Sequence, residues 1–387
     1  MITMNLPDPP ADALDHSNRL LQLIRDRLAA EGWLSFADYM SMALYHPGLG
    51  YYRGGSRKFG PEGDFVTAPE LTPLFGQTLA RALAPAMTAS APALIEVGAG
   101  TGVLAADLLR ALDAMGSPPE HYDILELSGE LRERQFDTLA RQVPALSARV
   151  RWLDRLPDRF DGVVVANEVL DVMPVHLVAS RADGVFERGI AEHDGKLCWA
   201  DRRAGGRILE AASALSLPKP AEGEYVTELN LAAGAWIREW SRRLGRGLML
   251  LLDYGYPRAE YYLPSRASGT LLCYYRHRAH GQPLLWPGLN DITAFVDFTA
   301  VAEAAHDAGL EIYGYTTQAS FLLNCGILNL LERRGPQESP DYIRAARAVQ
   351  RLTAPHEMGE LFKVLAIGRH CASAAAGFER GDRLHAL

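Results

Sequence analysis

The sequence lacks most features that mark secreted, membrane-spanning or metal-binding proteins. Only four of its 387 residues are cysteines, and no two of them form a C-x-x-C pair. Free thiols in a reducing compartment therefore fit the chain better than disulfides or a zinc site. No apolar run approaches the roughly 18–20 residues that a membrane span needs. The N-terminal segment has no basic stretch followed by an apolar run, so we expect no signal peptide.

Excess positive charge is also absent. The formal net charge is -8, which argues against a DNA partner and is typical of a soluble protein. Hydrophobic residues make up 48% of the chain and charged residues 22%, as in ordinary globular proteins. A chain of this length can bury one large core and a smaller lobe.

Helical patterns dominate the first 90 residues, whereas strands and helices alternate from about residue 91. The predicted buried strands are 94–97, 122–127, 150–153, 162–166 and 247–253, and the helices between the first three are 103–114 and 129–142. This alternation predicts a doubly wound parallel sheet covered on both faces, in which ligands bind above the carboxyl ends of the strands. Asp-Gly turns between 174 and 199 predict inserted hairpins, and residues 255–288 are predicted to form a long loop.

The most informative motif is the glycine-rich turn after the strand at 94–97. Gly98, Gly100 and Gly102 follow Glu96 at alternate positions. Glycine allows positive φ and close approach of a ligand, and the N-terminus of the next helix favours polar or anionic groups. A dinucleotide fingerprint needs its third glycine at position 103, which is valine here, so the spacing favours S-adenosylmethionine over NAD. An NAD-dependent oxidoreductase and a turn that only packs a helix remain the alternatives.

Two strand ends carry residues suited to a nucleoside. Glu126, with Leu127 beside it, ends the second strand and can accept both ribose hydroxyls of NAD or of S-adenosylmethionine. Trp152 and Leu153 end the third strand, where an aromatic or apolar side chain can stack on adenine. Trp152 suits the protein core equally well.

The fourth strand ends in a polar cluster. Asn167, Glu168 and Asp171 follow its buried residues and suit a cationic or amine-bearing methyl acceptor. Their carboxylates can orient a guanidinium by paired hydrogen bonds and take up the charge of the released proton. Helix capping by Asn167 is the alternative, and the two roles are compatible.

The predicted loop over 255–289 mixes tyrosines with arginines and histidines. We favour a lid or a docking surface for a protein over a nucleic-acid site, because the net charge is acidic. His277 and His280 have no evident third ligand, so no metal site is predicted.

Five segments together resemble the MidA-like (DUF185/COG1565) class I methyltransferases, a family that includes the mitochondrial arginine methyltransferase assisting assembly of respiratory complex I. These segments are GDFVTAPELTPLFGQTLA, EVGAGTG, ANEVLDVMPVH, LLLDYGY and GTLLCYYRHRAH. The resemblance implies an α/β fold with a Rossmann-like seven-stranded sheet of order 3-2-1-4-5-7-6, its last strand antiparallel. It also implies S-adenosyl-L-methionine as the cofactor and S-adenosyl-L-homocysteine as the product.

The family pattern places Gly98, Gly100 and Glu126 against the cofactor. It places the GDFVTAPE segment, with Asp64, Phe65 and Thr67, over the cofactor as a cover. The segment from Asn167 to Asp171 would line the acceptor side. We therefore expect a helical region over 1–90 and a methyltransferase core over 91–387, with insertions at about 172–230, 255–289 and 317–361.

The resemblance implies a protein arginine N-methyltransferase linked to respiratory-complex assembly. The alternatives are a methyltransferase of a small molecule or RNA, and a non-catalytic assembly factor that binds S-adenosylmethionine. The chain lacks the targeting region of the mitochondrial relatives, so we expect a bacterial cytoplasmic protein. The resemblance also implies a protein substrate. A homodimer is left open.

Overall fold

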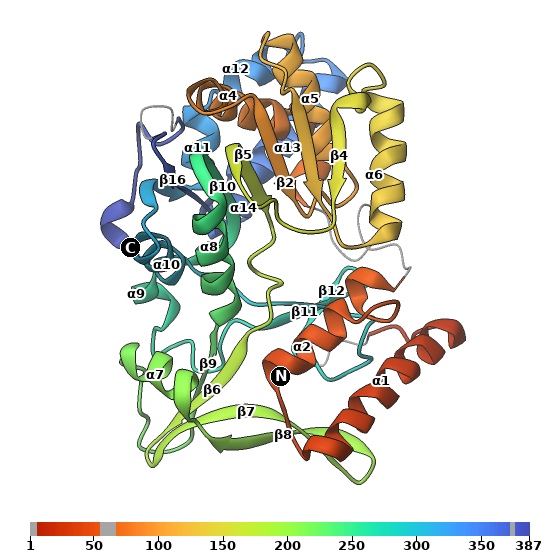
Figure 1. Ribbon diagram of the computed structural model, residues 1–387, viewed down its shortest axis with the longest axis vertical. Helices are drawn as coiled ribbons and strands as arrows, with labels where there is room; N and C mark the ends of the chain where they lie inside the picture. The colour runs from red at the N-terminus through yellow and green to blue at the C-terminus, as the bar shows by residue number, and fades with distance from the viewer. Residues whose placement is uncertain (1–5, 55–66, 372–375) are drawn as a thin grey trace. The chain divides into compact units, whose positions relative to one another are not determined.

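The computed structural model describes residues 6–54, 67–371 and 376–387, which form two compact units (Figure 1). Unit 1 comprises Met1–Phe65, Leu170–Ala233 and Arg258–Val296; unit 2 comprises Val66–Val169, Gly234–Pro257 and Asp297–Leu387. Each unit is thus assembled from three separate segments, whereas the sequence analysis placed one boundary near residue 90. Local patterns do not reveal which distant segments pack together.

Unit 2 contains the large sheet expected from the alternating strands. Its main path runs β15 (Glu311–Thr317), β16 (Phe362–Arg369), β10 (Leu244–Tyr256), β5 (Phe160–Asn167), β2 (Ala93–Val97), β3 (His121–Leu125) and β4 (Val150–Leu153). Neighbours from β10 to β4 are parallel, and β16 runs antiparallel to both of its neighbours. With these seven strands renumbered along the chain, the order is 3-2-1-4-5-7-6. The predicted α/β fold class is confirmed.

Both faces of the sheet are buried along β10, as its apolar sequence predicted. On β10, Leu248, Leu250 and Leu252 pack into one core with helices α4 and α5, while Met249 and Leu251, on the opposite face, are buried as well. The larger helices of this unit are α4 (Pro73–Ala89), α5 (Val103–Ala114), α6 (Gly129–Gln142), α10 (Phe298–Asp307) and α13 (Pro340–Thr353). The shorter ones are α3 (Ala68–Leu71), α11 (Gln318–Asn324), α12 (Ile327–Glu332) and α14 (Met358–Leu361).

One helix and one short strand each lie across a boundary between the units along the chain. Helix α8 (Leu231–Arg243) and the two-residue strand β14 (Val296–Asp297) each contain residues of both units. Across the described ranges, no helix combines the length and apolar character needed to cross a bilayer.

Unit 1 contains helices α1 (Ala11–Glu31) and α2 (Phe36–Tyr45) and an antiparallel sheet. The sheet path is β1 (Leu34–Ser35), β7 (Gly184–His193), β6 (His176–Arg181) and β9 (Tyr225–Leu229), with β8 (Lys196–Arg203) paired to β7 and α7 (Gly206–Ala214) following it. The predicted hairpins are confirmed by the pairings of β6 with β7 and of β7 with β8.

The prediction of one long loop over 255–288 was wrong. This stretch holds α9 (Arg258–Tyr261) and strands β11 (Leu272–Tyr275) and β12 (Arg278–His280), and β11 also pairs with β13 (Asp291–Thr293). Strands of three or four residues are too short to show a period of two in the sequence.

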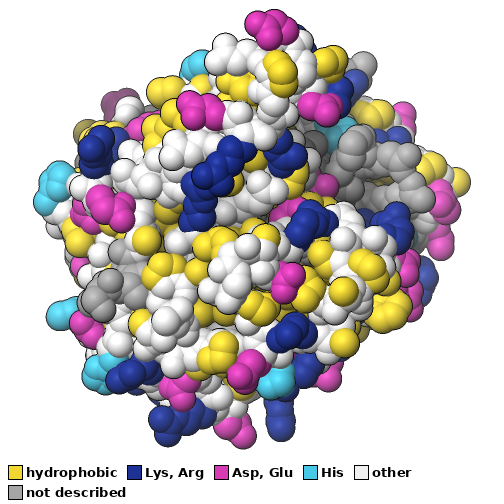
Figure 2. All heavy atoms as spheres, turned by 90° about the horizontal axis from the view of Figure 1, so that it is seen from above, with side chains coloured by type: hydrophobic (Ala, Val, Ile, Leu, Met, Phe, Trp, Pro, Cys, Tyr) yellow, Lys and Arg dark blue, Asp and Glu magenta, His cyan; other side chains and the backbone are white. Residues whose placement is uncertain are grey.

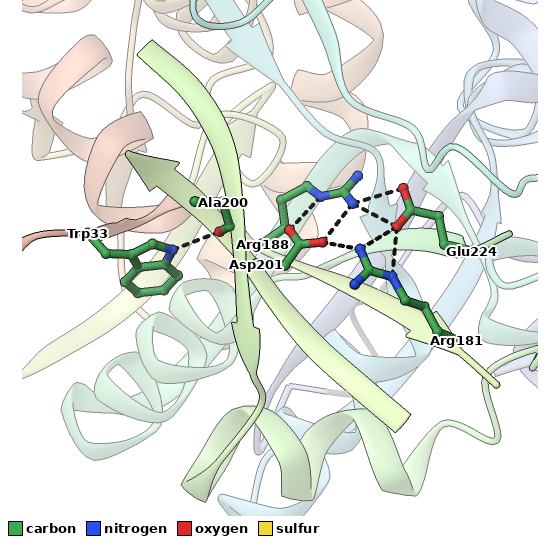
Figure 3. A network of polar contacts seen from close by, with 6 residues as sticks. All are labelled: Trp33, Arg181, Arg188, Ala200, Asp201 and Glu224. Atoms are coloured by element: carbon green, nitrogen blue, oxygen red, sulfur yellow. Dashed lines mark hydrogen bonds and ion pairs between the residues drawn. The ribbon is translucent and has the colours of Figure 1, made fainter. Parts of the chain in front are cut away.

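An ion-pair network joins strands β6, β7 and β8 of unit 1 to Glu224, which directly precedes β9 (Figure 3). Arg188 on β7 donates to both carboxylate oxygens of Asp201 on β8, each at 2.9 Å, and to Glu224 at 2.7 Å. Arg181 on β6 also donates to Asp201 and Glu224. Burial alone would raise the pKa of Asp201 and of Glu224, but hydrogen bonds and charges from the two arginines outweigh it and lower both. The network therefore stabilises the ionised carboxylates.

Candidate cofactor site

The turn over residues 98–102 joins β2 to α5 in a conformation that requires glycine. Gly98, Gly100 and Gly102 have φ values of 67°, 51° and 81°, in the left-handed region. A Cβ atom on Gly100 would meet no atom of the described residues within 4 Å, and one on Gly98 would meet only Val169, at 3.4 Å. The backbone at Gly98 and Gly100 is therefore open to close approach by a ligand.

Gly102 has a different structural role. A Cβ atom here would lie 3.0 Å from the Cα atom of Gln135 on α6, so a side chain would force the helix away. This residue also precedes the first turn of α5 as its N-cap. Packing of α6 accounts for the third glycine, and its contact with a cofactor remains a prediction.

Glu96 lies inside β2 with 2% of its surface exposed. Its carboxylate accepts a hydrogen bond from the Tyr122 hydroxyl at 2.5 Å. Burial raises the pKa of Glu96 to about 7; the Tyr122 hydrogen bond lowers this pKa, and the charge of Glu126 raises it. Near neutral pH the carboxyl group is thus divided between its protonated and ionised forms.

Glu126 follows β3 and is also buried. One of its oxygens accepts a hydrogen bond from the Ser128 N–H at 2.9 Å, and the other accepts one from the Gln135 amide at 3.1 Å. Burial raises its pKa, and these two hydrogen bonds oppose that effect. The backbone N–H of Leu127 also lowers this pKa by hydrogen bonding, and a carboxylate can accept about four hydrogen bonds, so Glu126 keeps capacity for a further donor.

Apolar side chains follow Glu126 in the sequence and lie at the end of β4. Leu127 is 57% exposed, unusual for a leucine directly after a buried strand. Trp152 is partly buried, and its ring lies 6.2 Å from that of Phe136, which is 59% exposed on α6. Leu153 is partly buried, and its carbonyl accepts a hydrogen bond from Arg132 at 2.8 Å. Partly exposed aromatic and apolar side chains of this kind suit a flat aromatic ligand.

The end of β5 has an unusual backbone. Asn167 is the last residue of this strand, and its amide donates to the Glu168 carboxylate at 3.1 Å. Glu168 has a φ of 54°, which side chains rarely adopt. Its N–H donates a hydrogen bond to the carbonyl oxygen of Leu252 at 2.9 Å. The N–H of the next residue, Val169, donates to the buried carboxylate of Asp253 at 3.2 Å. The neighbouring strand β10 thus holds Glu168 in this conformation.

The segment proposed to cover the cofactor is described only in part. Asp64 and Phe65 lie outside the described residues. Thr67 directly precedes α3, and the Glu70 carboxylate on that helix accepts a hydrogen bond from the Thr101 hydroxyl in the glycine-rich turn. The described end of this segment therefore contacts the turn.

Asp171, the third residue predicted for the acceptor side, belongs to unit 1. It is buried, and its carbonyl accepts a hydrogen bond from the Ala294 N–H at 2.9 Å. Its proposed role in acceptor binding remains a prediction.

Sequence reasoning assigned no role to several residues that organise the site, although Asp253 lies in the quoted segment LLLDYGY. Gln135 contacts the glycine-rich turn, Glu126 and Trp152. Arg132 donates to the Glu126 carbonyl at 2.8 Å and pairs with Asp154 at 2.7 Å. The Tyr122 hydroxyl donates a hydrogen bond to Glu96, and the Asp253 carboxylate accepts one from the N–H of Val169, the residue after Glu168. The one available signal was a glutamine in the apolar stripe of the helix at 129–142.

The glycine-rich turn, the buried carboxylates and the sheet all lie in a part of the sequence that matches a known family. Residues 78–316 match the family described as "Putative S-adenosyl-L-methionine-dependent methyltransferase". The chain belongs to this family. A COG1565 superfamily member of the methyltransferase type from Burkholderia thailandensis, in a structure bound to S-adenosyl-homocysteine, is 51% identical. That comparison covers 99% of this chain and 100% of the other, with a TM-score of 0.95.

More distant relatives of this methyltransferase span most of its length. The protein arginine methyltransferase NDUFAF7 homolog of Drosophila melanogaster, a mitochondrial protein, is 29% identical over 393 residues, covering 93% of this chain and 87% of its own. The mitochondrial protein arginine methyltransferase NDUFAF7 of Mus musculus is 28% identical over 394 residues, covering 92% and 86%.

The described residues of the methyltransferase fit the cofactor of its family. The open backbone at Gly98 and Gly100 admits a ligand without steric conflict from described residues. Glu126 has acceptor capacity for ribose hydroxyls, and the ring of Trp152 offers a surface for adenine. Their contact with the cofactor stays a prediction.

Proposed function

We propose that this methyltransferase transfers the methyl group of S-adenosyl-L-methionine to an arginine side chain of a protein. The open glycine-rich turn beside the buried Glu126 carries the cofactor assignment. It is supported by a bacterial relative, 51% identical, whose structure is bound to S-adenosyl-homocysteine. The arginine acceptor is supported by relatives that bear the name protein arginine methyltransferase and cover over nine tenths of the chain.

In this proposal the protein chiefly aligns the reactants. The cofactor supplies a methyl group already activated by its sulfonium. Glu126 accepts the ribose hydroxyls, and Gly98 and Gly100 let the backbone approach the cofactor. The other residues proposed to bind the cofactor are Glu96, Gly102, Leu127, Trp152, Leu153, Asn167, Asp64, Phe65 and Thr67.

Glu168 is the proposed acceptor-side residue, with Asn167 beside it and Asp171 as a further candidate. A carboxylate can hold a guanidinium by paired hydrogen bonds and balance the charge of the proton it releases. The left-handed φ of Glu168 supports this role, because strained backbone is enriched at functional sites.

A labelling experiment tests the proposal. Purified protein is incubated with radiolabelled S-adenosyl-L-methionine and extract from cells lacking the gene, and methylarginine is sought in the labelled band by mass spectrometry. Respiratory-complex subunits are the first bands to examine. Label in RNA or a small molecule would assign a different acceptor, and cofactor binding without any labelled product would indicate a non-catalytic assembly factor.

The variant Glu168→Gln sharpens this test. We expect it to bind S-adenosyl-homocysteine like the wild type while turnover falls about 100-fold, the scale of a lost acid–base or orienting group. The exposed Glu133→Gln on α6 is the matched control and should leave both quantities unchanged. Normal turnover by Glu168→Gln on the identified acceptor would remove Glu168 from the acceptor side.

The acidic net charge of -8 favours a protein over RNA as the acceptor. On the described part of the face seen in Figure 2, Lys and Arg side chains lie among acidic and hydrophobic ones.

We also propose that the protein acts in the bacterial cytoplasm. All four cysteines are free, as suits a reducing compartment, and the relative at 51% identity is bacterial. Fractionation of cells carrying a tagged protein tests this location, and recovery from the periplasm would contradict it.

A further inference from the structure

Gln135 on α6 bonds to the ends of three neighbouring strands. Its amide nitrogen donates to the Gly100 carbonyl at 3.0 Å and to the Glu126 carboxylate at 3.1 Å. Its amide oxygen accepts a hydrogen bond from the Trp152 indole at 2.9 Å. Gly100 follows β2, Glu126 follows β3 and Trp152 lies in β4. The Gln135 side chain is fully buried.

The helix itself does not require glutamine at this position. Leu131, Gln135, Thr138 and Leu139 form the buried stripe of α6, at the spacing of an amphipathic helix. Leucine at 135 would fill the same stripe without burying an amide, which is unfavourable unless its hydrogen bonds are made. The presence of an amide at position 135 is therefore explained by its hydrogen bonds to Gly100, Glu126 and Trp152.

We propose that Gln135 is a positioning residue for the adenosine part of the cofactor, fixing the ribose acceptor Glu126 and the adenine-facing Trp152 relative to the glycine-rich turn. Every group it holds is one assigned above to cofactor binding, and the close approach of α6 is made possible by Gly102. The inference rests on the proposed function, since it takes the turn to be the cofactor site.

The contact with Glu126 gives this role a pH signature. Burial raises the pKa of Glu126, and the Gln135 amide is one of the donors that lower it. Two other charged side chains interact here. The charge of Glu126 raises the pKa of Glu96 on β2, and the charge of Arg132 on α6 lowers the pKa of Glu126. Removing the amide raises the pKa of Glu126, so its ionised form, which can accept both ribose hydroxyls, is lost at a higher pH.

The test measures the affinity of the full chain for S-adenosyl-homocysteine by calorimetry between pH 6 and pH 8. Q135L should bind about 10-fold more weakly at pH 8, the effect of losing one or two hydrogen bonds, and its affinity should fall on acidification at a higher pH than that of the wild type. The control Q142L makes the same substitution at an exposed position of the same helix and should behave like the wild type.

Q135E provides the second, independent variant. It conserves side-chain size and the acceptor for Trp152 but places a carboxylate beside Glu126, and like charges so close cannot both ionise readily. Protonation restores a donor, so its affinity should rise as the pH falls from 8 to 6, opposite to Q135L. A purely structural role would shift the melting temperature of both variants without this opposite pH dependence.

Wild-type affinity and an unchanged pH profile in Q135L would overturn the proposal, as would parallel profiles of Q135L and Q135E. If Q135L does not fold, the direction of the Q135E profile decides alone. Absence of binding by the wild type would instead contradict the proposed function, so the two failures are distinguishable.

Discussion

Two sets of carboxylates in this chain have pKa values shifted in opposite directions. In unit 2, Glu96 and Glu126 form no ion pair with any described side chain, and burial raises the pKa of both. In unit 1, Asp201 and Glu224 are bonded to two arginines, and the pKa of both is lowered. Both sets are carboxylates, but Asp201 and Glu224 are only partly buried and have arginine partners, which Glu96 and Glu126 lack.

This difference distinguishes the proposed ligand site of unit 2 from the ion-pair network that stabilises unit 1. Arginine saturates the carboxylates of unit 1 and leaves little for a ligand to bind. The carboxylates of unit 2 keep acceptor capacity at some cost to stability, which is typical of residues retained for binding. Substitutions should therefore affect stability in one set and cofactor affinity in the other.

The largest loss of stability is expected from Arg188→Met in unit 1. It leaves Asp201 and Glu224 with one arginine instead of two, and for these partly buried ion pairs we expect a loss of about 2 kcal/mol of unfolding free energy, between the values typical of exposed and of buried pairs. Urea unfolding should show this loss, whereas affinity for S-adenosyl-homocysteine should stay unchanged. Arg203→Met, at an exposed position, is the control and should cost less than about 1 kcal/mol. A normal unfolding midpoint for Arg188→Met would refute the structural role.

Glu96→Gln should change how stability depends on pH. The folded pKa of about 7 lies above the ordinary 4.5, so the native state binds more protons between these values and the unfolding free energy of the wild type falls as the pH rises. The variant lacks this titration. From pH 4.5 to pH 8 its stability relative to the wild type should increase by on the order of 3 kcal/mol. Parallel pH profiles from denaturant unfolding would show that Glu96 titrates normally.

Glu126→Gln should have the opposite consequence to Arg188→Met. Losing charge-assisted hydrogen bonds to the ribose should weaken S-adenosyl-homocysteine binding about 100-fold. Unfolding free energy should fall by less than about 1 kcal/mol, because a buried charge is removed as well. Calorimetry and urea unfolding measure the two quantities. Large loss of stability with intact affinity would place Glu126 with the structural carboxylates instead.

Local signals predicted the elements around the turn well. Helices α5 and α6 have the predicted bounds, because Gly102 at a positive φ precedes one and the Ser128 side chain caps the other by accepting from the Leu131 N–H. The strand ends were predicted to within one or two residues, since each closes an apolar run: 122–127 was predicted for β3 (His121–Leu125) and 162–166 for β5 (Phe160–Asn167).

Long-range pairing could not be predicted in the same way. Strand β1 pairs with β7 through Leu34 and Ile190, more than 150 residues apart, and nothing in either segment specifies the other. The role of Gln135 is similar, because it depends on three contacts supplied by other segments. Such residues become recognisable only once the strands are placed side by side.

The position of β16 in the unit 2 sheet has a consequence for biosynthesis. This strand is hydrogen-bonded between β10 and β15, yet it is the last strand to leave the ribosome. Until residue 369 has emerged, β10 and β15 each present an unpaired edge, the kind of surface on which chains aggregate. Premature termination before Phe362 should therefore yield a polypeptide that chaperones retain or proteases remove.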